Sequence, residues 1–192
     1  MTSGLLTGAD GRTRCAWAGQ TPEYAAYHDD EWGQVVHGEA ALFERLTLEA
    51  FQSGLAWITI LRKREGFRRA FAGFDPEQVA VFSPDDESQL LANAAIVRNG
   101  AKIRAAIANA RAVVALRVDG GLDALVWSFA PEPAPRRPAS AGVPATSPQS
   151  VALAKALRSR GFRFVGPTTA YAAMQACGLV DDHVEGCHVM PS

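Results

Sequence analysis

The two ends of the chain carry cysteine and histidine at spacings that suit a metal ion. His183 and Cys187 are separated by three residues near the end of the 192-residue chain, and Cys15 and His28 by twelve near its start. One such pair alone is usually chance. Together, two thiolates and two imidazoles make the ligand set of a closed structural zinc site. If one ion binds all four side chains, the fold must bring the two ends of the chain together.

The cysteine count also bears on the compartment. The chain has three cysteines, and an odd, low number argues against a disulfide framework. The N-terminus lacks a charged start followed by an apolar run, and no apolar stretch approaches the ~20 residues of a membrane-spanning helix. We therefore expect reduced thiols in a cytoplasmic protein without a membrane segment, with Cys177 as a small core residue on an apolar helix face.

Apolar residues at helical spacing, with capping residues before them, predict an all-α protein of one domain. Residues 1–13 are expected to be a disordered leader, and residues 130–150, with six prolines, an extended loop. We expect no strand pair. Helices are predicted over residues 39–53, 57–71, 75–82, 83–94, 102–120, 122–129, 150–162 and 168–179.

One carboxylate falls on an apolar helix stripe. Glu49 lies seven residues after Leu42 and three after Leu46, so it shares their face of the predicted helix. Burial of an unpaired carboxylate is costly, so such a residue is neutralised, paired or functional. The sequence leaves two interpretations open: a site residue, or a side chain that reaches solvent or pairs with Arg45.

Aromatic residues gather near the N-terminus and after the Glu49 helix. Trp17, Tyr24, Tyr27 and Trp32 lie within sixteen residues, and Trp57 follows. Ordinary core packing is the default for such a cluster. Next to a buried carboxylate, these rings could also stack on a flat ligand ring, especially a cationic one.

Positive charge is concentrated although the net charge is only −1. Residues 61–69 and 155–163 are two basic stretches, which are either solvated helix faces or a phosphate-binding surface. The turn "VRNGAK" places Arg98, Asn99, Gly100 and Lys102 at the start of a helix. Free backbone N–H groups at a helix start suit a phosphate, although a plain helix–helix turn has the same sequence features.

Six motifs resemble one known family. The chain resembles the bacterial 3-methyladenine DNA glycosylase I family from about residue 14 to residue 187, and the motifs are long and specific. They are "RCAWAGQTPEYAAYHDDEWG" (14–33), "LFERLTLEAFQSGLAWITILRKRE" (42–65), "AAIVRNGAKIRAAIANA" (94–110), "VWSF" (126–129), "AKALRSRGF" (154–162) and "YAAMQACGLVDDHVEGC" (171–187).

The resemblance implies a divergent helix-hairpin-helix glycosylase fold whose termini are joined by one structural zinc. It implies a single glycosylase domain over 14–192, with a helix-hairpin-helix lobe at about 40–125 and a terminal zinc lobe at about 14–38 plus 150–188. The zinc ligands carried over from the family are Cys15, His28, His183 and Cys187, in agreement with the spacing.

The resemblance also implies roles in base and DNA binding. Glu49 matches the glutamate that recognises the base and is the one catalytic candidate. Trp17, Tyr24, Tyr27 and Trp57 match the aromatic pocket. The matches to the DNA-binding loop and hairpin are Gly54, Leu55, Arg98, Asn99, Gly100 and Lys102.

The implied activity is base excision. Such an enzyme flips N3-methyladenine out of alkylated double-stranded DNA and hydrolyses its glycosidic bond, releasing free 3-methyladenine and leaving an abasic site. No lysine is evidently placed as a nucleophile, so no lyase activity is expected. Selectivity among methylated purines is not fixed by the sequence. A monomer is expected.

The chain departs from the family at two places. Members carry a basic residue where this chain has Gly100, and often glycine where it has Ala101, so fewer ionic contacts to the DNA backbone are expected. The C-terminal "HVMPS" also diverges, and His188 is expected to be a surface residue without a role in the metal site.

Two other classes compete with this interpretation. A zinc-dependent hydrolase would need an open coordination position, which four protein ligands do not leave. A damage-binding module without activity would not need Glu49 and Trp57 together, and a base-release assay on methylated DNA separates it from an enzyme.

Overall fold

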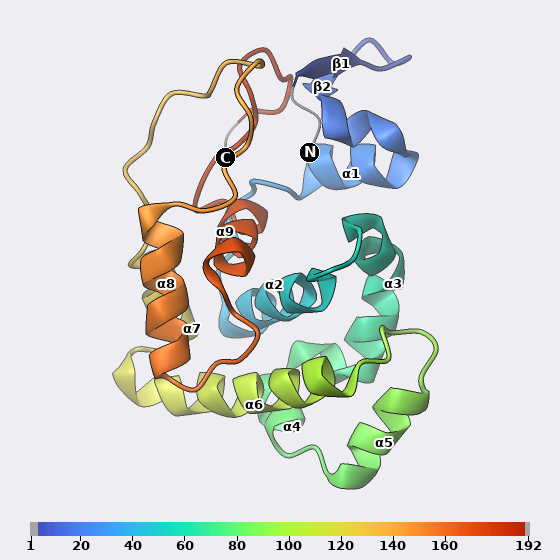
Figure 1. Ribbon diagram of the computed structural model, residues 1–192, viewed down its shortest axis with the longest axis vertical. Helices are drawn as coiled ribbons and strands as arrows, with labels where there is room; N and C mark the ends of the chain where they lie inside the picture. The colour runs from blue at the N-terminus through green and yellow to red at the C-terminus, as the bar shows by residue number, and fades with distance from the viewer. Residues whose placement is uncertain (1–3, 191–192) are drawn as a thin grey trace.

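The computed structural model describes residues 4–190, and most of them lie in helices (Figure 1). Three short 3-10 helices, at Ala16–Gln20, Ala72–Phe74 and Arg117–Asp119, supplement the α-helices. None of the described helices is long and apolar enough to cross a membrane. The α-helices are α1 (Pro22–Asp30), α2 (Glu39–Gln52), α3 (Trp57–Ala70), α4 (Pro76–Ala80), α5 (Pro84–Ala92), α6 (Gly100–Leu116), α7 (Gly121–Trp127), α8 (Pro148–Ser159) and α9 (Pro167–Ala176).

The N-terminal region differs from the expectation of a disordered leader and no strand pair. Strand β1 (Leu5–Thr7) pairs antiparallel with β2 (Thr13–Cys15), with Leu5 opposite Cys15. Residues 1–3 of the expected leader lie outside the described part of the chain. The hairpin is stapled by Asp10, whose carboxylate accepts hydrogen bonds from Arg14 at 2.6 and 2.9 Å. Two three-residue strands with few apolar residues give no alternating pattern, so the sequence signal was too weak to detect.

Side-chain caps fix the starts of α4 and α5 where the sequence predicts them, and a further cap begins α8 at Pro148, two residues before the predicted start. Asp75 accepts a hydrogen bond from Glu77 N before Pro76, and Ser83 and Asp86 form a reciprocal capping box before α5. Ser147 and Ser150 form a second box at α8. Proline at the first helical position sacrifices only an N–H that has no partner within the helix, so these starts are well specified.

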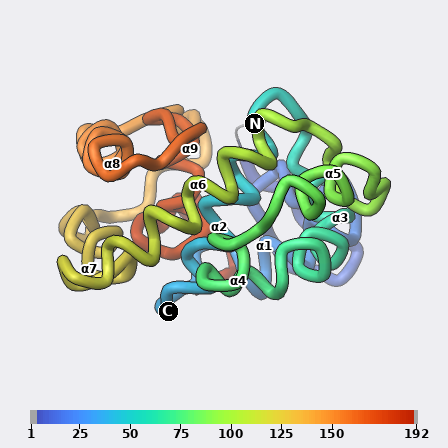
Figure 2. Tube along the Cα trace, turned by 90° about the horizontal axis from the view of Figure 1, so that it is seen from below, coloured from blue at the N-terminus to red at the C-terminus, as the bar shows by residue number. Residues whose placement is uncertain are grey.

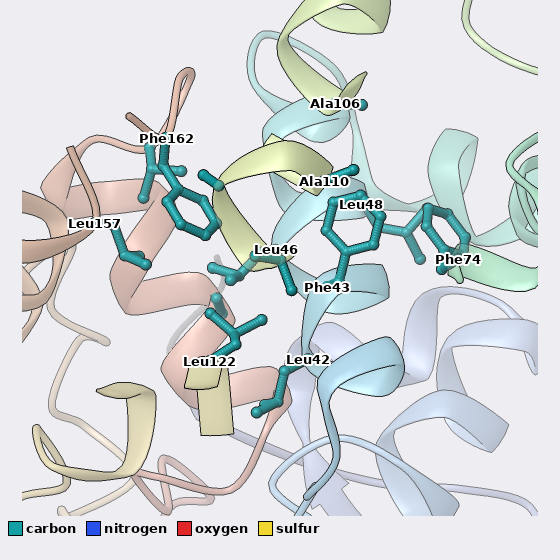
Figure 3. Packing of buried hydrophobic residues seen from close by; sticks show 14 of the residues in the cluster. Leu42, Phe43, Leu46, Leu48, Phe74, Ala106, Ala110, Leu122, Leu157 and Phe162 are labelled. Atoms are coloured by element: carbon teal, nitrogen blue, oxygen red, sulfur yellow. The ribbon is translucent and has the colours of Figure 1, made fainter. Parts of the chain in front are cut away.

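The main hydrophobic core lies between α2, α6 and the helices on either side of them. Figure 2 shows α6 running across the molecule, with α7, α8 and α9 at one end and α3 and α5 at the other. Leu157 and Phe162 from the α8 region reach Leu46 and Leu122 in this core (Figure 3). Helices α8 and α9 therefore pack in the same core as α2, α6 and α7.

A second, smaller core joins the two ends of the chain. Figure 1 shows the C-terminal segment beside the β1–β2 hairpin and α1. Its apolar members come from both ends and include Cys15, Trp17, Tyr27, Val184 and Cys187. His188 N donates to Thr13 O at 2.8 Å, so backbone hydrogen bonds also connect the ends.

The proline-rich loop between α7 and α8 is tied to the C-terminal segment by two ion pairs. Arg136 Nε lies 2.8 Å from Asp181 Oδ2, and Arg137 NH2 lies 2.7 Å from Asp182 Oδ1. Glu185 N also donates to Arg137 O at 2.8 Å. The loop is extended, as predicted, and it fixes the residues next to His183.

Candidate active site and metal centre

A cavity of about 240 Å³ lies where α1, the end of α2, the start of α3 and α9 meet. It contains all five residues that the sequence analysis selected for base binding. It also contains five that the analysis did not assign to a site. The lining residues are Trp17, Gln20, Tyr24, Tyr27, Trp32, Glu49, Gln52, Trp57, Ala172 and Gln175.

Aromatic rings form the cavity walls and pack against one another. Trp17 makes edge contacts with Tyr24 and Trp32, with ring centroids 5.8 and 5.1 Å apart. Tyr27 and Trp57 lie 5.3 Å apart with their planes inclined by 47°. Since each ring is held by its neighbours, the cavity presents flat apolar surfaces in fixed positions.

Tyr24 fixes the position of the Trp57 wall. Its hydroxyl oxygen accepts a hydrogen bond from Ile58 N at 3.0 Å. That N–H belongs to the first turn of α3 and has no partner within the helix. The hydroxyl therefore caps α3 from α1 and sets where Trp57 stands at the cavity edge.

Glu49 supplies a carboxyl group to this apolar cavity. It is 6% exposed, and no ion pair or hydrogen bond of its side chain occurs among the described residues. Burial raises its pKa to about 8, while the nearby charge of Arg45 acts in the opposite direction. Arg45 itself pairs with Glu31 at 3.3 Å. Glu49 therefore does not form the salt bridge with Arg45 that was one of the two interpretations of the sequence.

Glu49 also affects its neighbour. Burial raises the pKa of Tyr27 well above its ordinary value, and the Glu49 charge raises it further. The phenol is therefore protonated across the physiological range and remains a hydrogen-bond donor inside the cavity.

Gln175 was missed by the sequence analysis. It lies on α9, four residues after Tyr171 and three after Ala172, and is 4% exposed. The available signal was a lone amide in the otherwise apolar predicted helix at 168–179. A polar side chain there must find partners inside the fold, because burial without hydrogen bonds is costly.

Three of the four predicted metal ligands meet at one point. The ligand atoms of Cys15, His28 and Cys187 lie within 4.8 Å of one another, and Cys187 Sγ is 3.5 Å from His28 Nε2. All three residues are buried. Hydrogen bonding from Cys15 and His28 lowers the pKa of Cys187, which favours the thiolate form that binds a metal ion.

His183, the fourth predicted ligand, lies beside this group. Its ring centroid is 4.9 Å from that of His28, and its Nε2 is buried without a hydrogen-bond partner. Its Nδ1 lies 2.7 Å from Asp181 Oδ1, and His28 Nδ1 lies 2.8 Å from Asp29 Oδ1. In zinc sites a carboxylate commonly holds one imidazole nitrogen and leaves the other for the metal. Both histidines follow that pattern, so the four residues fit a metal ion.

His188 lies beside the four predicted ligands, with its ring centroid 6.2 Å from that of His28. Its Nδ1 lies 3.1 Å from Thr13 O, and its Nε2 lies 3.5 Å from Asp29 Oδ2. The side chain is 28% exposed. It contacts Asp29, which in turn bonds the predicted ligand His28. The sequence predicts instead a surface histidine without a role in the metal site.

Gly54 and Leu55 form an exposed turn between α2 and α3. Gly54 has φ +83°, a conformation that favours glycine, and Leu55 is 39% exposed. The turn is held by Leu55 N donating to Gln52 O at 2.7 Å and by Gln52 Nε2 donating to Leu55 O at 3.2 Å. A large apolar side chain is therefore presented on a short, fixed turn next to the cavity residue Gln52.

Lys102 is not the solvent-facing cation that the turn sequence suggested. It is 8% exposed, and its Nζ donates to Phe51 O at 2.9 Å and to Ser53 O at 2.6 Å. Hydrogen bonds to two carbonyl oxygens at the end of α2 replace the hydration of the Lys102 ammonium. Those carbonyls are available because they have no partner within the helix. The ammonium is consequently engaged and unavailable to a phosphate.

The other residues of the predicted hairpin remain accessible. Arg98 and Asn99 are exposed, and Asn99 caps α6 by accepting from Lys102 N at 3.2 Å. Gly100 begins the helix, and a Cβ there would lie 3.3 Å from Arg104 NH1. The start of α6 thus offers an anion its backbone N–H groups and the guanidinium of Arg98, which forms no ion pair with residues 4–190.

The two basic stretches differ in how their charges are used. In residues 61–69, Arg62 pairs with Glu23, Arg64 with Glu31 and Arg68 with Glu44. In residues 155–163, four exposed cations form no ion pair with the described residues. These are Lys155, Arg158, Arg160 and Arg163. Arg69 of the first stretch is also exposed and forms no ion pair with the described residues, but the second stretch offers four such cations to a phosphate backbone. Asn109 holds the second stretch in place by bonding both backbone groups of Arg163.

Comparison with known families matches nearly the whole chain. A family model described as methyladenine glycosylase matches residues 17–190. A DNA-3-methyladenine glycosylase 1 from Escherichia coli (strain K12) is 46% identical over 182 residues, covering 93% of this chain and 97% of that protein. A DNA-3-methyladenine glycosylase from Haemophilus influenzae is 43% identical over 178 residues, covering 91% and 96%.

Solved structures agree with the sequence matches. A crystal structure of a 3-methyladenine DNA glycosylase I has a TM-score of 0.87 and 47% identity, covering 93% of this chain and 100% of that one. A second such enzyme, from Staphylococcus aureus, has a TM-score of 0.87 and 31% identity, covering 93% and 97%. A third structure, a Tyr-to-Phe variant in complex with 3-methyladenine, has the same score and 31% identity, covering 93% and 98%.

Proposed function

Because this chain belongs to the methyladenine glycosylase family, we propose that it flips N3-methyladenine out of double-stranded DNA and hydrolyses the bond between base and sugar. The class of enzyme is DNA-3-methyladenine glycosylase. The observation that carries the proposal is a buried carboxyl, Glu49, inside a cavity walled by aromatic rings. Such a cavity is closed to a base stacked in a duplex, so the nucleotide must leave the helix to enter it.

Recognition of the base uses charge as well as shape. N3-methylation makes the base of the intact nucleotide cationic. Tyr27 and Trp57 stack on its ring, and cation–π attraction adds about 0.5–2 kcal/mol for the charged form. Glu49 bonds the edge of the ring, and the positive charge of the base favours the ionised form of its carboxyl.

Cleavage of the glycosidic bond depends on the positive charge that the methylated base carries before the reaction. When the glycosidic bond breaks, its electron pair moves to the cationic ring and neutralises it. Water attacks the sugar carbon and loses a proton, which leaves an abasic site and free 3-methyladenine. Glu49 holds the leaving base in position for this step. The arrangement lowers the barrier for a bond that is weak before binding.

Lyase chemistry is not part of the proposal. Strand cleavage by a glycosylase needs an amine nucleophile at the sugar. Lys102 donates to two carbonyl oxygens, and Lys63 Nζ donates to Ala94 O at 2.6 Å. The third lysine of the chain, Lys155, lies on α8, and none of the three lines the cavity.

DNA binding is assigned to three surfaces. Leu55 enters the gap left by the flipped nucleotide, and Gly54 lets the turn approach the duplex. Arg98, Asn99 and Gly100 hold a phosphate at the start of α6. The unpaired cations at residues 155–163 contact the backbone further along the duplex. The ammonium of Lys102 is excluded from these contacts.

One structural zinc is proposed at the terminal cluster. Cys15, His28, His183 and Cys187 would hold it, which leaves no open position for a water ligand. When bound, it would tie the two ends of the chain together and neutralise the thiolates. The chemistry of base release stays with the cavity residues. The protein is proposed to act as a monomer in the cytoplasm, within a single domain.

The test is release of bases from methylated duplex DNA by the purified chain. We expect free 3-methyladenine, abasic sites and uncut strands until alkali is added. Binding without release would support a damage-binding module instead. Strand breaks without alkali would overturn the assignment as a monofunctional enzyme.

A further inference from the structure

The amide of Gln175 has a fixed orientation at the cavity wall. Its Nε2 donates to Asp182 Oδ2 at 2.6 Å, and its Oε1 has no hydrogen-bond partner among the residues of the described range 4–190. Gln175 is only 4% exposed, and it lines the cavity. An amide whose nitrogen binds a carboxylate must present its oxygen on the opposite side.

Asp182 cannot reverse this orientation. Its Oδ2 also accepts from Tyr171 Oη at 2.8 Å, and its Oδ1 is paired with Arg137 at 2.7 Å. The side chain of Asp182 is only 7% exposed. Arg137 donates to one oxygen of Asp182 and Tyr171 to the other, so both oxygens act as acceptors. If Gln175 turned over, its oxygen would face a carboxylate oxygen, so the amide nitrogen is held on that side.

We propose that Gln175 Oε1 distinguishes methylated adenine from methylated guanine by accepting a hydrogen bond from the exocyclic amine of the flipped base. This inference rests on the proposed function and adds a selectivity to it. Adenine carries an amine at ring position 6, and guanine carries a carbonyl oxygen there. An oxygen fixed in the cavity wall attracts the amine of adenine and repels the carbonyl oxygen of guanine.

Aromatic stacking and Glu49 do not make this distinction between the free bases. Aromatic stacking acts equally on both purines, and both substrates carry the methyl group at N3. When a neutral free base binds, Glu49, whose pKa is about 8, can present either an O–H or a bare oxygen near neutral pH, so it tolerates a donor or an acceptor. Gln175 is the cavity residue whose hydrogen-bonding sense is set by a charged neighbour. A buried acceptor left facing another acceptor loses its hydrogen bond without compensation from water.

Asp182→Asn provides a sharp test, because it should reverse the amide. Arg137 still needs an acceptor, so the oxygen of the new side chain faces Arg137 and its NH2 faces Gln175. Gln175 then turns its oxygen to that NH2 and its own nitrogen to the cavity. Gln175→Met is the second variant, which keeps the side-chain length and removes both polar atoms.

A matched control is available outside the cavity. Gln78 Nε2 donates to Asp75 Oδ2 at 2.7 Å on the exposed surface of α4, and Gln78 does not line the cavity. Gln78→Met therefore removes the same kind of hydrogen bond without touching the base site.

The measurement is the affinity of each protein for free 3-methyladenine and free 3-methylguanine, followed by tryptophan fluorescence. Wild type and Gln78→Met should prefer 3-methyladenine equally. The preference should fall by about 10-fold or more in Gln175→Met and further in Asp182→Asn, in line with ~1–3 kcal/mol for one base-edge contact. If Gln175→Met does not fold, as judged by circular dichroism, Asp182→Asn decides the question.

The outcomes separate this inference from the proposed function. A wild type that releases 3-methyladenine from DNA, with an unchanged preference in Gln175→Met or in a folded Asp182→Asn, overturns the role of Gln175 alone. A wild type that releases no base from methylated DNA overturns the proposed function, and the selectivity with it.

Discussion

Lys102 Nζ donates a hydrogen bond of 2.6 Å to the carbonyl oxygen of Ser53. The bond joins the first turn of α6 to Ser53, 49 residues earlier in the chain, at the start of the turn that presents Leu55. A second bond, to Phe51 O, holds the last turn of the helix that contains Glu49. The cation therefore couples the proposed phosphate-binding end of α6 to the turn proposed to enter the duplex.

Loss of the Lys102 hydrogen bonds should affect DNA binding differently from loss of a phosphate contact made by Arg98. Lys102→Met should slow base release and lower the melting temperature, since two carbonyl oxygens lose their donor. It should leave the slope of log K against log salt unchanged. Arg98→Ala should reduce that slope by about 0.9, the value for one phosphate contact on duplex DNA. Affinity for duplex DNA measured at several salt concentrations compares the two. A reduced slope in Lys102→Met would show that its ammonium reaches a phosphate after all.

Glu49→Gln should bind methylated DNA but release the base slowly, because an amide cannot provide the negative charge that holds a cationic ring. A loss of about 10²-fold in the single-turnover rate is expected for one charged contact in a closed site. Glu44→Gln is the control, since Glu44 lies on the same helix and pairs with Arg68 instead. Release of 3-methyladenine at the wild-type rate by Glu49→Gln would remove Glu49 from the proposed role.

Glu49 should also make stability depend on pH. Its pKa is about 8 in the folded chain, against an ordinary value of 4.5, so the folded state binds the proton more tightly than the unfolded state. The contribution of this group to stability is full below about pH 4.5 and is lost as the pH rises through about 8. In thermal melting from pH 5 to pH 9, the melting temperature of Glu49→Gln should rise relative to that of the wild type as the pH increases. Parallel curves for the two proteins would contradict the raised pKa.

Metal analysis of the purified chain should find about one zinc per molecule. Cys187→Ala should lose the metal and several kcal/mol of stability, because zinc binding adds directly to folding free energy. Cys177→Ala should keep the metal, since Cys177 is buried in the main core away from the terminal cluster. A stable, active protein without metal would refute the structural role.

Leu55→Ala should slow release from duplex DNA more than from a single strand. A shorter side chain fills less of the gap that the flipped nucleotide leaves, and the cost of unstacking appears only in a duplex. Affinity for free 3-methyladenine should not change, because Leu55 does not line the cavity. Equal losses on both DNA forms would assign Leu55 a purely structural role.

The sequence alone determined most of the helices and much of the candidate site, although it did not predict α1, the helix that positions Tyr24, Tyr27 and His28. A helix is built from contacts three and four residues apart, so caps such as Ser83 with Asp86, and the place of Glu49 on an apolar stripe, are visible in the sequence. The Cys/His spacing likewise predicted that the two ends meet, and three of the four ligands lie together as expected.

Only the tertiary structure decided how the polar groups are used. Whether Lys102 faces solvent, whether Arg64 is paired, and whether Gln175 reaches the cavity each depend on partners that another element brings close. Arg64 meets Glu31 from 33 residues away, and Lys102 meets Phe51 from 51 residues away. No local pattern encodes such pairs, because a hydrogen bond or ion pair depends on distance in space. Three arginines of residues 61–69 are thus paired with acids, whereas the four cations of residues 155–163 form no ion pair with the described residues.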